Sequence, residues 1–271
     1  MISVVLPIIT PTPFLRAMTE FSIATLKAHA TAPFELIVVE ANGLNFQPAP
    51  ERPVVLQRTL LQIDKYLPFN PGIGAIREFN AALKLATGDY IVSTGNDVIV
   101  PEGWDAELLR IFAEQPDCGI ASLAAVEPGA IVGPSSPREL VSQQAEIGPV
   151  TEVEGMYSPF MMWRRGWEMC EDYQKIYCDS DLVMRVYATG QRAYRSCTHH
   201  VRHFARMTSD RVDPEKHADD LAHDERLFYQ RWGRKRWLMF ALLRAGRVTY
   251  GQEHLSFTCP INLHYTIGAT P

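Results

Sequence analysis

The chain has 271 residues, of which 46% are hydrophobic and 21% are charged, the balance of a globular protein with a full-sized core. Its formal net charge of -5 argues against a protein that binds nucleic acid with its whole surface. The five cysteines are odd in number and show no C-x-x-C spacing. This excludes a disulfide framework and a zinc ribbon and favours a reducing, cytoplasmic setting. No run approaches the ~18 to 20 apolar residues that span a bilayer, so we expect a soluble protein or one peripheral to a membrane.

Short runs of β-branched residues alternate with helix-length amphipathic segments, a pattern that predicts a largely parallel sheet covered by helices. We expect one α/β catalytic domain over residues 1–208 and a helical C-terminal appendage, packed on it, over residues 209–271. The expected strands are residues 2–6, 35–39, 54–56, 90–93 and 119–123. The expected helices are residues 15–30, 73–86, 104–114, 180–189 and 213–230. Gly88 and Gly190 are expected to close two of them, because glycine accepts a positive φ without strain.

Three polar loops follow expected strands, at residues 7–12, 40–43 and 94–98. In open α/β sheets, ligands bind in the crevice beyond the carboxyl ends of the strands. The sequence therefore predicts a binding site built from these three loops.

Four motifs in one chain order resemble those of glycosyltransferase family 2. The first is SVVLP at residues 3–7 followed by ELIVVEANG at residues 35–43. The second, within residues 70–91, reads Asn-Pro-Gly, then Asn, then Ala-x-Gly-Asp-Tyr-Ile. The third is Asn-Asp-Val followed by Pro-x-Gly-Trp, within residues 96–104. The fourth, within residues 179–203, reads Asp-Ser-Asp-Leu, then Arg, then Gly, then His.

This resemblance covers residues 1–205 and implies a GT-A type α/β fold. It also implies an inverting glycosyltransferase of the hexosyltransferase class, which moves a sugar from a nucleotide-diphosphate donor to an acceptor hydroxyl with the help of a metal ion. The acceptor could be a glycan, a lipid-linked intermediate, a protein or a modified nucleic acid.

A nucleotide-sugar donor presents a base, a ribose and a diphosphate, and each needs its own partners. The resemblance assigns Glu40 to the ribose or the base, where a carboxylate accepts hydrogen bonds; the alternative is a solvated loop residue. Pro7, Ile8 and Thr10 would pack on the base, or form a simple turn. The other expected donor-binding residues are Asn42, Asn70, Gly72, Asn96 and Asp97.

Departure of the diphosphate concentrates negative charge, which a hard divalent cation such as Mn²⁺ or Mg²⁺ neutralises. Asp97 occupies the position of the metal-binding D-x-D motif, and His203 is the second expected ligand. The first acid of that motif is replaced by Gly95, so the diphosphate and water would complete the coordination. His199 and His200 lie close to His203 in sequence, and an ordinary polar role for His203 is the alternative.

The acceptor hydroxyl needs a general base, and Asp179 matches the catalytic aspartate of the family. It lies at the start of an expected helix, whose dipole favours the ionised form. Asp181 lies four residues before Arg185 and is expected to form an ion pair with it. Trp104, Trp163 and Asp181 are the expected acceptor-side residues, although the apolar run that contains Trp163 is also typical of a core strand.

Residues 231–247 carry six positive charges and no acid. Basic residues interleaved with bulky apolar ones suit a membrane surface or a phosphorylated acceptor. The alternative is a helix packed on the catalytic domain with its arginines in solvent.

Two other functions are compatible with parts of the sequence. A catalytically silent protein that binds nucleotide sugars, or a scaffold, is suggested by Gly95. A nucleotidyltransferase would carry a glycine-rich basic loop after the first strand, whereas residues 8–13 read IITPTP. Gly72-x-Gly74 lacks the third glycine of a dinucleotide fingerprint, so a dinucleotide site is not expected.

Overall fold

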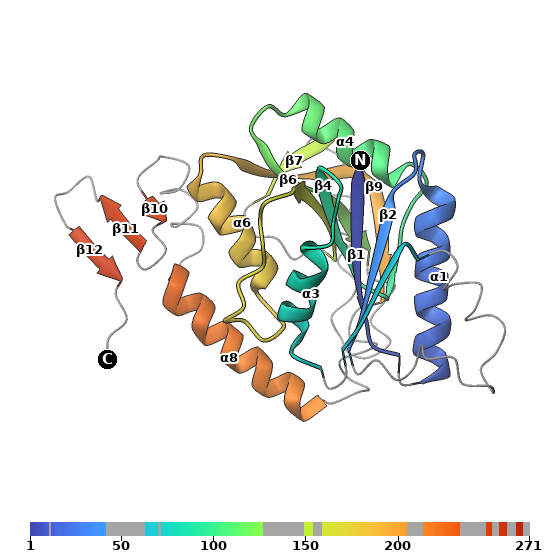
Figure 1. Cartoon of the computed structure of the whole chain (residues 1–271). Helices are drawn as coiled ribbons and strands as arrows, with labels where there is room; N and C mark the ends of the chain where they lie inside the picture. Colours follow the sequence, from blue (N-terminus) through green and yellow to red (C-terminus); the bar gives the residue numbers. More distant parts are fainter. Residues whose placement is uncertain are drawn as a thin grey trace.

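The structure of the protein is a computed structural model. It describes residues 1–10, 12–41, 63–69, 72–126, 149–153, 159–204, 214–233, 248–250, 255–258 and 264–267. These residues form a nine-stranded sheet with helices on both faces, and a separate three-stranded sheet near the C-terminus (Figure 1). The expected α/β architecture is confirmed.

The large sheet contains β1 (Ile2–Ile8), β2 (Glu35–Ala41), β3 (Lys65–Phe69), β4 (Tyr90–Thr94), β5 (Val98–Ile99), β6 (Cys118–Val126), β7 (Val150–Glu152), β8 (Phe160–Arg164) and β9 (Arg192–His203). The small antiparallel sheet contains β10 (Val248–Tyr250), β11 (Leu255–Thr258) and β12 (His264–Ile267). The helices are α1 (Pro13–His29), α3 (Ala75–Leu83), α4 (Trp104–Glu114), α6 (Cys178–Ala188) and α8 (Pro214–Trp232).

The strand directions bring many carboxyl ends to one edge of the sheet. The strand order is β3-β2-β1-β4-β8-β6-β9-β5, and β7 also pairs with β9. The first four strands are mutually parallel. β8 is antiparallel to both β4 and β6, so β6 runs in the direction of β4, and β9 is parallel to β6. The carboxyl ends of β1, β2, β4, β6 and β9 therefore lie at the same edge, which we call the carboxyl edge.

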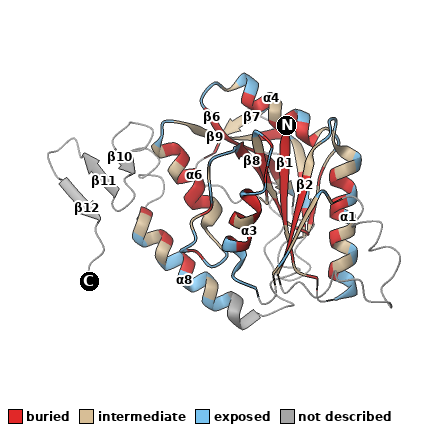
Figure 2. Cartoon of the chain, viewed as in Figure 1, coloured by how far each residue is buried: buried red, intermediate tan, exposed pale blue. Residues whose placement is uncertain are grey.

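Alternating side chains of the strands divide the core into two layers. On β1, Val5 faces the layer that contains α3, α6 and α8, whereas Val4 and Leu6 face the layer that contains α1 and α4. On β8, Trp163 lies in the first layer and Met162 in the second. This period of two is what buries both faces of a strand between helices. Figure 2 shows the central strands as the most deeply buried part of the molecule.

Most expected elements are present, with shifted ends. The expected strand at residues 54–56 lies outside the described residues, and the third strand along the chain is β3. The expected helix at residues 73–86 is shorter, because α3 ends at Leu83. The expected closure of a helix by Gly190 is confirmed, with φ of 84°.

The role expected for Gly88 is wrong. Gly88 is not among the glycines with a positive φ. Instead, a Cβ at this position would lie 2.7 Å from the backbone nitrogen of Ser3 and 2.8 Å from the carbonyl oxygen of Met1. Glycine is needed here because two backbone segments approach closely, and not because of backbone conformation.

The C-terminal segment contains the expected helix, α8, and also the strands of the small sheet, which the sequence did not predict. α8 belongs to the core of the protein, since Phe228 and Trp232 are fully buried and lie in the same layer as α3 and α6. Within the described part of the chain, no helix is both long enough and apolar enough to cross a bilayer.

Candidate functional site

The carboxyl edge gathers residues that are far apart in the sequence. Thr10 follows β1, Glu40 lies at the end of β2, Asp97 follows β4, and His203 is the last residue of β9. α6 leads into β9 through the tight turn at Gly190, so α6 runs back along the sheet and begins near the same edge (Figure 1). The ends of β1, β2 and β4, which the expected loops follow, therefore lie at one edge of the sheet.

Asp97 and His203 are neighbours in the structure. β5 and β9 pair antiparallel with Val98 opposite His203, and the Phe204 amide donates to the Asp97 carbonyl at 2.9 Å. This pairing places His203 Nε2 3.6 Å from Asp97 Oδ1, with the side chains only 7% and 14% exposed. The structure thus brings these two side chains together, a carboxylate and an imidazole at one point of the edge.

The turn that carries Asp97 is held by α1. Ser22 Oγ donates to the Val98 carbonyl oxygen at 2.6 Å, and Asn96 Nδ2 donates to Thr19 Oγ1 at 3.0 Å. Asn96 is buried, and its amide is engaged in fixing the turn. Its contribution to a donor site is therefore first to position Asp97.

Gly95 is explained by the position of the Asp97 carboxylate. A Cβ at residue 95 would lie 2.6 Å from Asp97 Oδ1, so the carboxylate occupies the space that a side chain there would take. A second acid at this position would require Asp97 to move. In the part of the chain that the structure describes, no three His, Cys, Asp or Glu side chains gather closely enough to enclose a metal ion.

Glu40 is fully buried, so the alternative of a solvated loop residue is wrong. Its two carboxylate oxygens accept hydrogen bonds from Thr10 Oγ1 at 2.9 Å and from the Tyr66 hydroxyl at 2.5 Å. Arg16 Nε in turn donates to the Thr10 carbonyl oxygen at 3.2 Å. Glu40 therefore fixes the loop after β1 to β2 and β3. Sequence reasoning missed Tyr66, because β3 combines charged and proline residues and shows no strand-like alternation.

The remaining donor-side residues are distributed unevenly along the edge. Ile8 is buried and Pro7 is half-buried at the end of β1, while Gly72 is exposed before α3. Asn42 and Asn70 lie outside the described residues. The structure thus brings Thr10, Glu40 and Asp97 to the edge and leaves two of the expected contacts undescribed.

Asp179 lies in the first turn of α6 and is half-buried. Its Oδ1 accepts the Ser180 amide at 2.7 Å. A carboxylate in this first turn is favoured in its ionised form by the helix dipole. The N-cap residue of α6 is Tyr177. It has φ of 62° and is the one non-glycine residue with positive φ in the described ranges. A left-handed conformation of this kind is concentrated at sites where the surroundings hold it in place.

Asp181 is fully buried and forms the expected ion pair with Arg185, at 2.8 Å. Its other contacts are with Trp232 Nε1 at 2.8 Å, Arg231 Nη1 at 3.2 Å and the Tyr173 hydroxyl at 3.3 Å. Asp181 joins α6 to the end of α8 in the core. The expected acceptor-side role of Asp181 is corrected, because its carboxylate is enclosed by protein donors.

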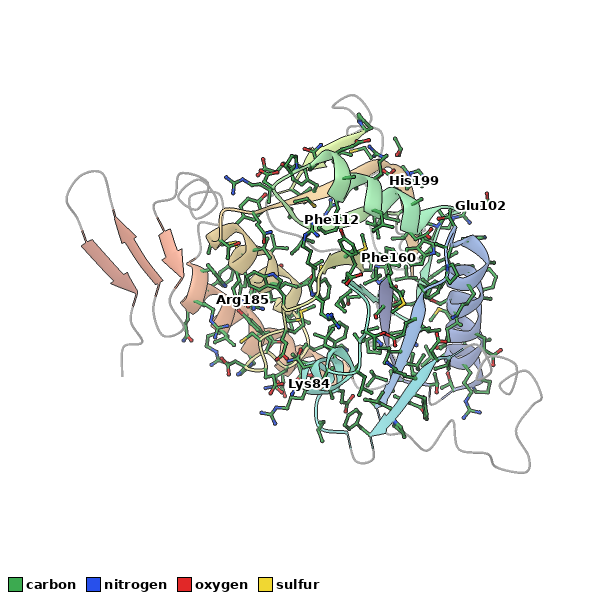
Figure 3. All side chains as sticks on the ribbon, turned by 45° about the horizontal axis from the view of Figure 1, so that its top comes forward. Lys84, Glu102, Phe112, Phe160, Arg185 and His199 are labelled. Carbon is green, nitrogen blue, oxygen red and sulfur yellow. The ribbon has the colours of Figure 1, made fainter. Side chains whose placement is uncertain are left out.

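The two tryptophans expected on the acceptor side are also core residues. Trp104 is fully buried, packs edge to face on Phe34 and Phe160 at 5.4 Å, and donates from Nε1 to the Leu26 carbonyl at 3.2 Å. Figure 3 shows Phe160 among the core side chains beneath α4. Trp163 is fully buried in the opposite layer of the sheet. Neither side chain can contact an acceptor, and the core alternative for the run around Trp163 is the correct one.

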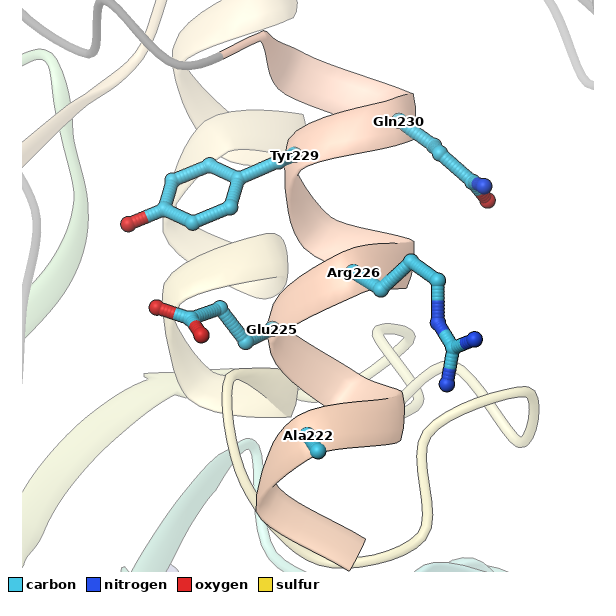
Figure 4. A pocket seen from close by; sticks show the side chains of 5 residues that line it. All are labelled: Ala222, Glu225, Arg226, Tyr229 and Gln230. Carbon is cyan, nitrogen blue, oxygen red and sulfur yellow. The ribbon is translucent and has the colours of Figure 1, made fainter. Parts of the chain in front are cut away.

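A broad depression of about 700 Å³ lies on the outer surface of α8. Its lining includes Glu225, Arg226 and Tyr229 (Figure 4). None of the residues expected to bind donor, metal or acceptor lines it. A smaller cavity of about 130 Å³ lies beside Lys84 and Trp167, away from the carboxyl edge. We therefore define the candidate site by the side chains at the edge and not by either cavity.

Comparison with known proteins adds information about the fold. No model of a known protein family matches the sequence. A search of curated proteins also finds no match.

Solved structures of S. aureus TarS are similar to this chain. TarS 1–349 in complex with UDP has a TM-score of 0.55 at 12% identity, and the match covers 97% of this chain and 98% of that one. A second structure of TarS 1–349 has a TM-score of 0.55 at 13% identity, covering 89% and 80%. A longer TarS structure has a TM-score of 0.54 at 11% identity and covers 98% of this chain. This chain spans 60% of that longer one. At these identities the likeness shows a shared fold and nothing finer.

Proposed function

We propose that this protein is a glycosyltransferase that uses a nucleotide-diphosphate sugar as its donor. The observation that carries the proposal is the Asp97–His203 pair at the carboxyl edge, in a fold shared with a protein crystallised with UDP. A diphosphate bound at such an edge needs positive charge beside it. A carboxylate next to an imidazole could bind a divalent cation, and the cation would then bind the diphosphate. The resemblance of the motifs to family 2 and its GT-A type fold supports the same conclusion.

The residues present fit a divalent ion of the Mn²⁺ or Mg²⁺ type. Asp97 offers an oxygen ligand and His203 a nitrogen ligand 3.6 Å apart, and imidazole and carboxylate together suit Mn²⁺ better than Mg²⁺. Two protein ligands leave positions for diphosphate oxygens and water, which is the usual situation for ions that act on phosphates. When bound, the ion would supply the positive charge that stabilises the departing diphosphate.

Asp179 is the proposed general base of an inverting reaction. As an ionised carboxylate it would accept the proton of the acceptor hydroxyl while the oxygen attacks the anomeric carbon and the bond to the diphosphate breaks. Glu40 and Thr10 would act on the donor side by holding the loop after β1, which includes Pro7 and Ile8. Transfer of a hexose, a cytoplasmic location and an acceptor of glycan, lipid-linked, protein or modified nucleic acid type complete the proposal.

We propose contact with a membrane or a phosphorylated acceptor for a shorter segment than residues 231–247. Arg231 is ion-paired with Asp172 at 2.9 Å and with Asp181 at 3.2 Å, and Trp232 is fully buried. These two residues face the core, so we propose the contact for residues 234–247, which lie outside the described residues.

A thermal-shift screen of UDP- and GDP-sugars, each with and without Mn²⁺, tests the donor and the metal together. We expect a donor to stabilise the protein modestly alone and clearly with Mn²⁺, because each completes the coordination of the other. Release of the nucleoside diphosphate from the best donor then tests for catalysis. Absence of any shift across the panel would contradict the proposal.

A catalytically silent binder of nucleotide sugars is the second candidate, favoured by the small number of protein ligands around Asp97. It would show the same Mn²⁺-dependent shift and no release of nucleoside diphosphate. The two candidates therefore differ in the second measurement and agree in the first.

A further inference from the structure

The segment of residues 170–177, which leads into α6, contacts α8 at several points, and one of them is the carboxylate of Asp224. Asp224 is fully buried, and it accepts three consecutive backbone amides of this segment. Gln174 donates to Oδ1 at 2.8 Å, while Lys175 and Ile176 donate to Oδ2 at 2.8 and 2.7 Å. Short hydrogen bonds from amides to an ionised carboxylate are stronger than neutral ones. α8 thus determines the path of the chain immediately before Asp179.

A second contact with α8 holds the strained residue in the same segment. Tyr177, with φ of 62°, stacks its ring on Phe228 of α8 at 5.0 Å with an interplanar angle of 27°. Tyr229 also lies near this ring, at 6.4 Å. A bulky residue keeps a left-handed conformation only where its surroundings impose it. Because Tyr177 is the cap residue of α6, this conformation sets the direction in which the first turn begins.

The residues on either side of this segment are also held in place. Asn80 of α3 forms a two-way contact with Met169, accepting its amide at 3.0 Å and donating to its carbonyl oxygen at 2.8 Å. At the far end, Arg231 and Trp232 of α8 donate to Asp181 of α6. The chain before Asp179 is therefore held on both sides, and α8 contacts it through Asp224, Phe228 and Arg231.

From these contacts we infer that α8 is part of the catalytic apparatus and that Asp224 is a positioning residue for Asp179. The inference rests on the proposed function, in which Asp179 is the base. Asp224 holds residues 174–176, these fix the strained cap at Tyr177, and the cap directs Asp179 toward the carboxyl edge. A base that is displaced by about 1 Å loses much of its effect, because proton transfer requires an aligned hydrogen bond. The sequence pattern of the family motifs ends before α8, so this link is visible only in the folded chain.

The test uses the full chain and the UDP- or GDP-sugar with the largest Mn²⁺-dependent thermal shift, and it measures release of the nucleoside diphosphate. Asp224→Asn keeps the size of the side chain and replaces one accepting oxygen with a donor that the backbone amides cannot use. We expect the turnover number to fall by about 10-fold or more, while KM for the donor and the Mn²⁺-dependent shift stay at wild-type values. Glu225→Gln, the next residue on the same helix and exposed to solvent, is the matched control and should keep wild-type turnover.

A double-mutant cycle separates positioning from general destabilisation. If Asp224 acts through Asp179, then Asp224→Asn should cause no further loss in a chain that already carries Asp179→Asn. A loss of equal size in both backgrounds, or wild-type turnover of a folded Asp224→Asn chain, would overturn the inference.

A second variant covers the case in which Asp224→Asn does not fold. Tyr177→Asn keeps a residue that tolerates a positive φ but removes the ring that stacks on Phe228, and it should show the same fall in turnover and the same lack of additivity with Asp179→Asn. Wild-type turnover of folded Tyr177→Asn would overturn the inference. The proposed function fails in a distinguishable way, because in that case Asp179→Asn alone would retain wild-type turnover or the wild-type chain would release no nucleoside diphosphate.

Discussion

The imidazole of His203 and the carboxylate of Asp97 face one another at 3.6 Å across the junction of β5 and β9. Both side chains are nearly buried, and their positions are set by backbone pairing and not by a flexible loop. If this pair binds the proposed cation, little further ordering of the two side chains is needed on binding.

If Asp97 holds the metal, Asp97→Ala should abolish the difference between the thermal shifts of a nucleotide sugar with and without Mn²⁺. At a donor concentration of 100 times the Kd measured with Mn²⁺, the donor stabilises the protein by about 2.7 kcal/mol in total, so the metal-dependent part that Asp97→Ala removes is at most that amount. His203→Ala should reduce the difference as well. His199→Ala is the control, because His199 lies on the same strand but faces Glu107 of α4 at 3.8 Å. A variant Asp97→Ala with a full metal-dependent shift would place the metal elsewhere.

Replacing the proposed base should separate binding from transfer. Asp179→Asn keeps the size of the side chain and its contact with the Ser180 amide, but it cannot take a proton. We expect the donor affinity to be unchanged and the rate of transfer to fall by about 10² to 10⁴ or more. Both are measured on the purified variant, by titration of the donor and by release of the nucleoside diphosphate. Wild-type turnover would remove Asp179 from the mechanism.

Asp181→Asn should act on stability, and more strongly than an exposed ion pair would suggest. Asp181 is fully buried among Arg185, Arg231 and Trp232, so its neutralisation removes the charge at the centre of this buried network. Breaking a buried pair costs ~3 to 5 kcal/mol, measured as the free energy of unfolding in urea. Asp172→Asn is the control, because Asp172 contacts the same Arg231 from an exposed position and should cost under ~1 kcal/mol.

Acid should weaken the contact between the starts of β1, β2 and β3 through Glu35. Burial alone would raise the pKa of Glu35. Hydrogen bonds from Lys65, Ser3 and Thr87 have the larger, opposite effect, and the net result is a pKa lowered from 4.5 to about 2. A lowered folded pKa means that the stabilisation is fully present above pH 4.5 and is lost as the pH falls toward about 2. The amount is at most ~3 kcal/mol, since one pKa unit corresponds to about 1.4 kcal/mol. Unfolding measured from pH 2 to 7 should show a shallower acid slope for Glu35→Gln than for the wild-type chain; equal slopes would contradict this assignment.

Truncation after residue 233 should preserve folding and donor binding, whereas truncation near residue 209 should not. Truncation near residue 209 removes α8 and with it Phe228 and Trp232 from the core. Each fully buried aromatic side chain contributes roughly 1.5 to 3 kcal/mol to the free energy of unfolding. Thermal denaturation and donor titration of both chains test this expectation.

If residues 234–247 contact a membrane or a phosphorylated acceptor, the 1–233 chain should bind donor normally and lose transfer to its natural acceptor. Unchanged transfer by that chain would exclude the proposed contact.

The short apolar runs of β1, β2 and β4 and the helical periodicity of α1, α4 and α6 are local properties, so the sequence alone indicated the α/β class and the loops that follow these strands. The order of the motifs was also sufficient to select Asp97, His203 and Asp179. The elements could be inferred because each depends on residues that are close together in the sequence. The candidate residues could be inferred because the motifs are defined by their order along the chain.

Only the tertiary structure decided which polar groups are buried and what surrounds them. Glu40, Asp181 and Asp224 are fully buried, although each is a charged residue that a sequence alone would place in solvent. Burial of such groups depends on partners that come from distant segments, such as Tyr66 for Glu40 and Arg231 for Asp181. In the same way, Trp104 is an apolar core residue because α4 lies over the sheet at that point. Long-range pairing of strands and docking of helices supply these partners, and no periodicity within a short window of sequence reports them.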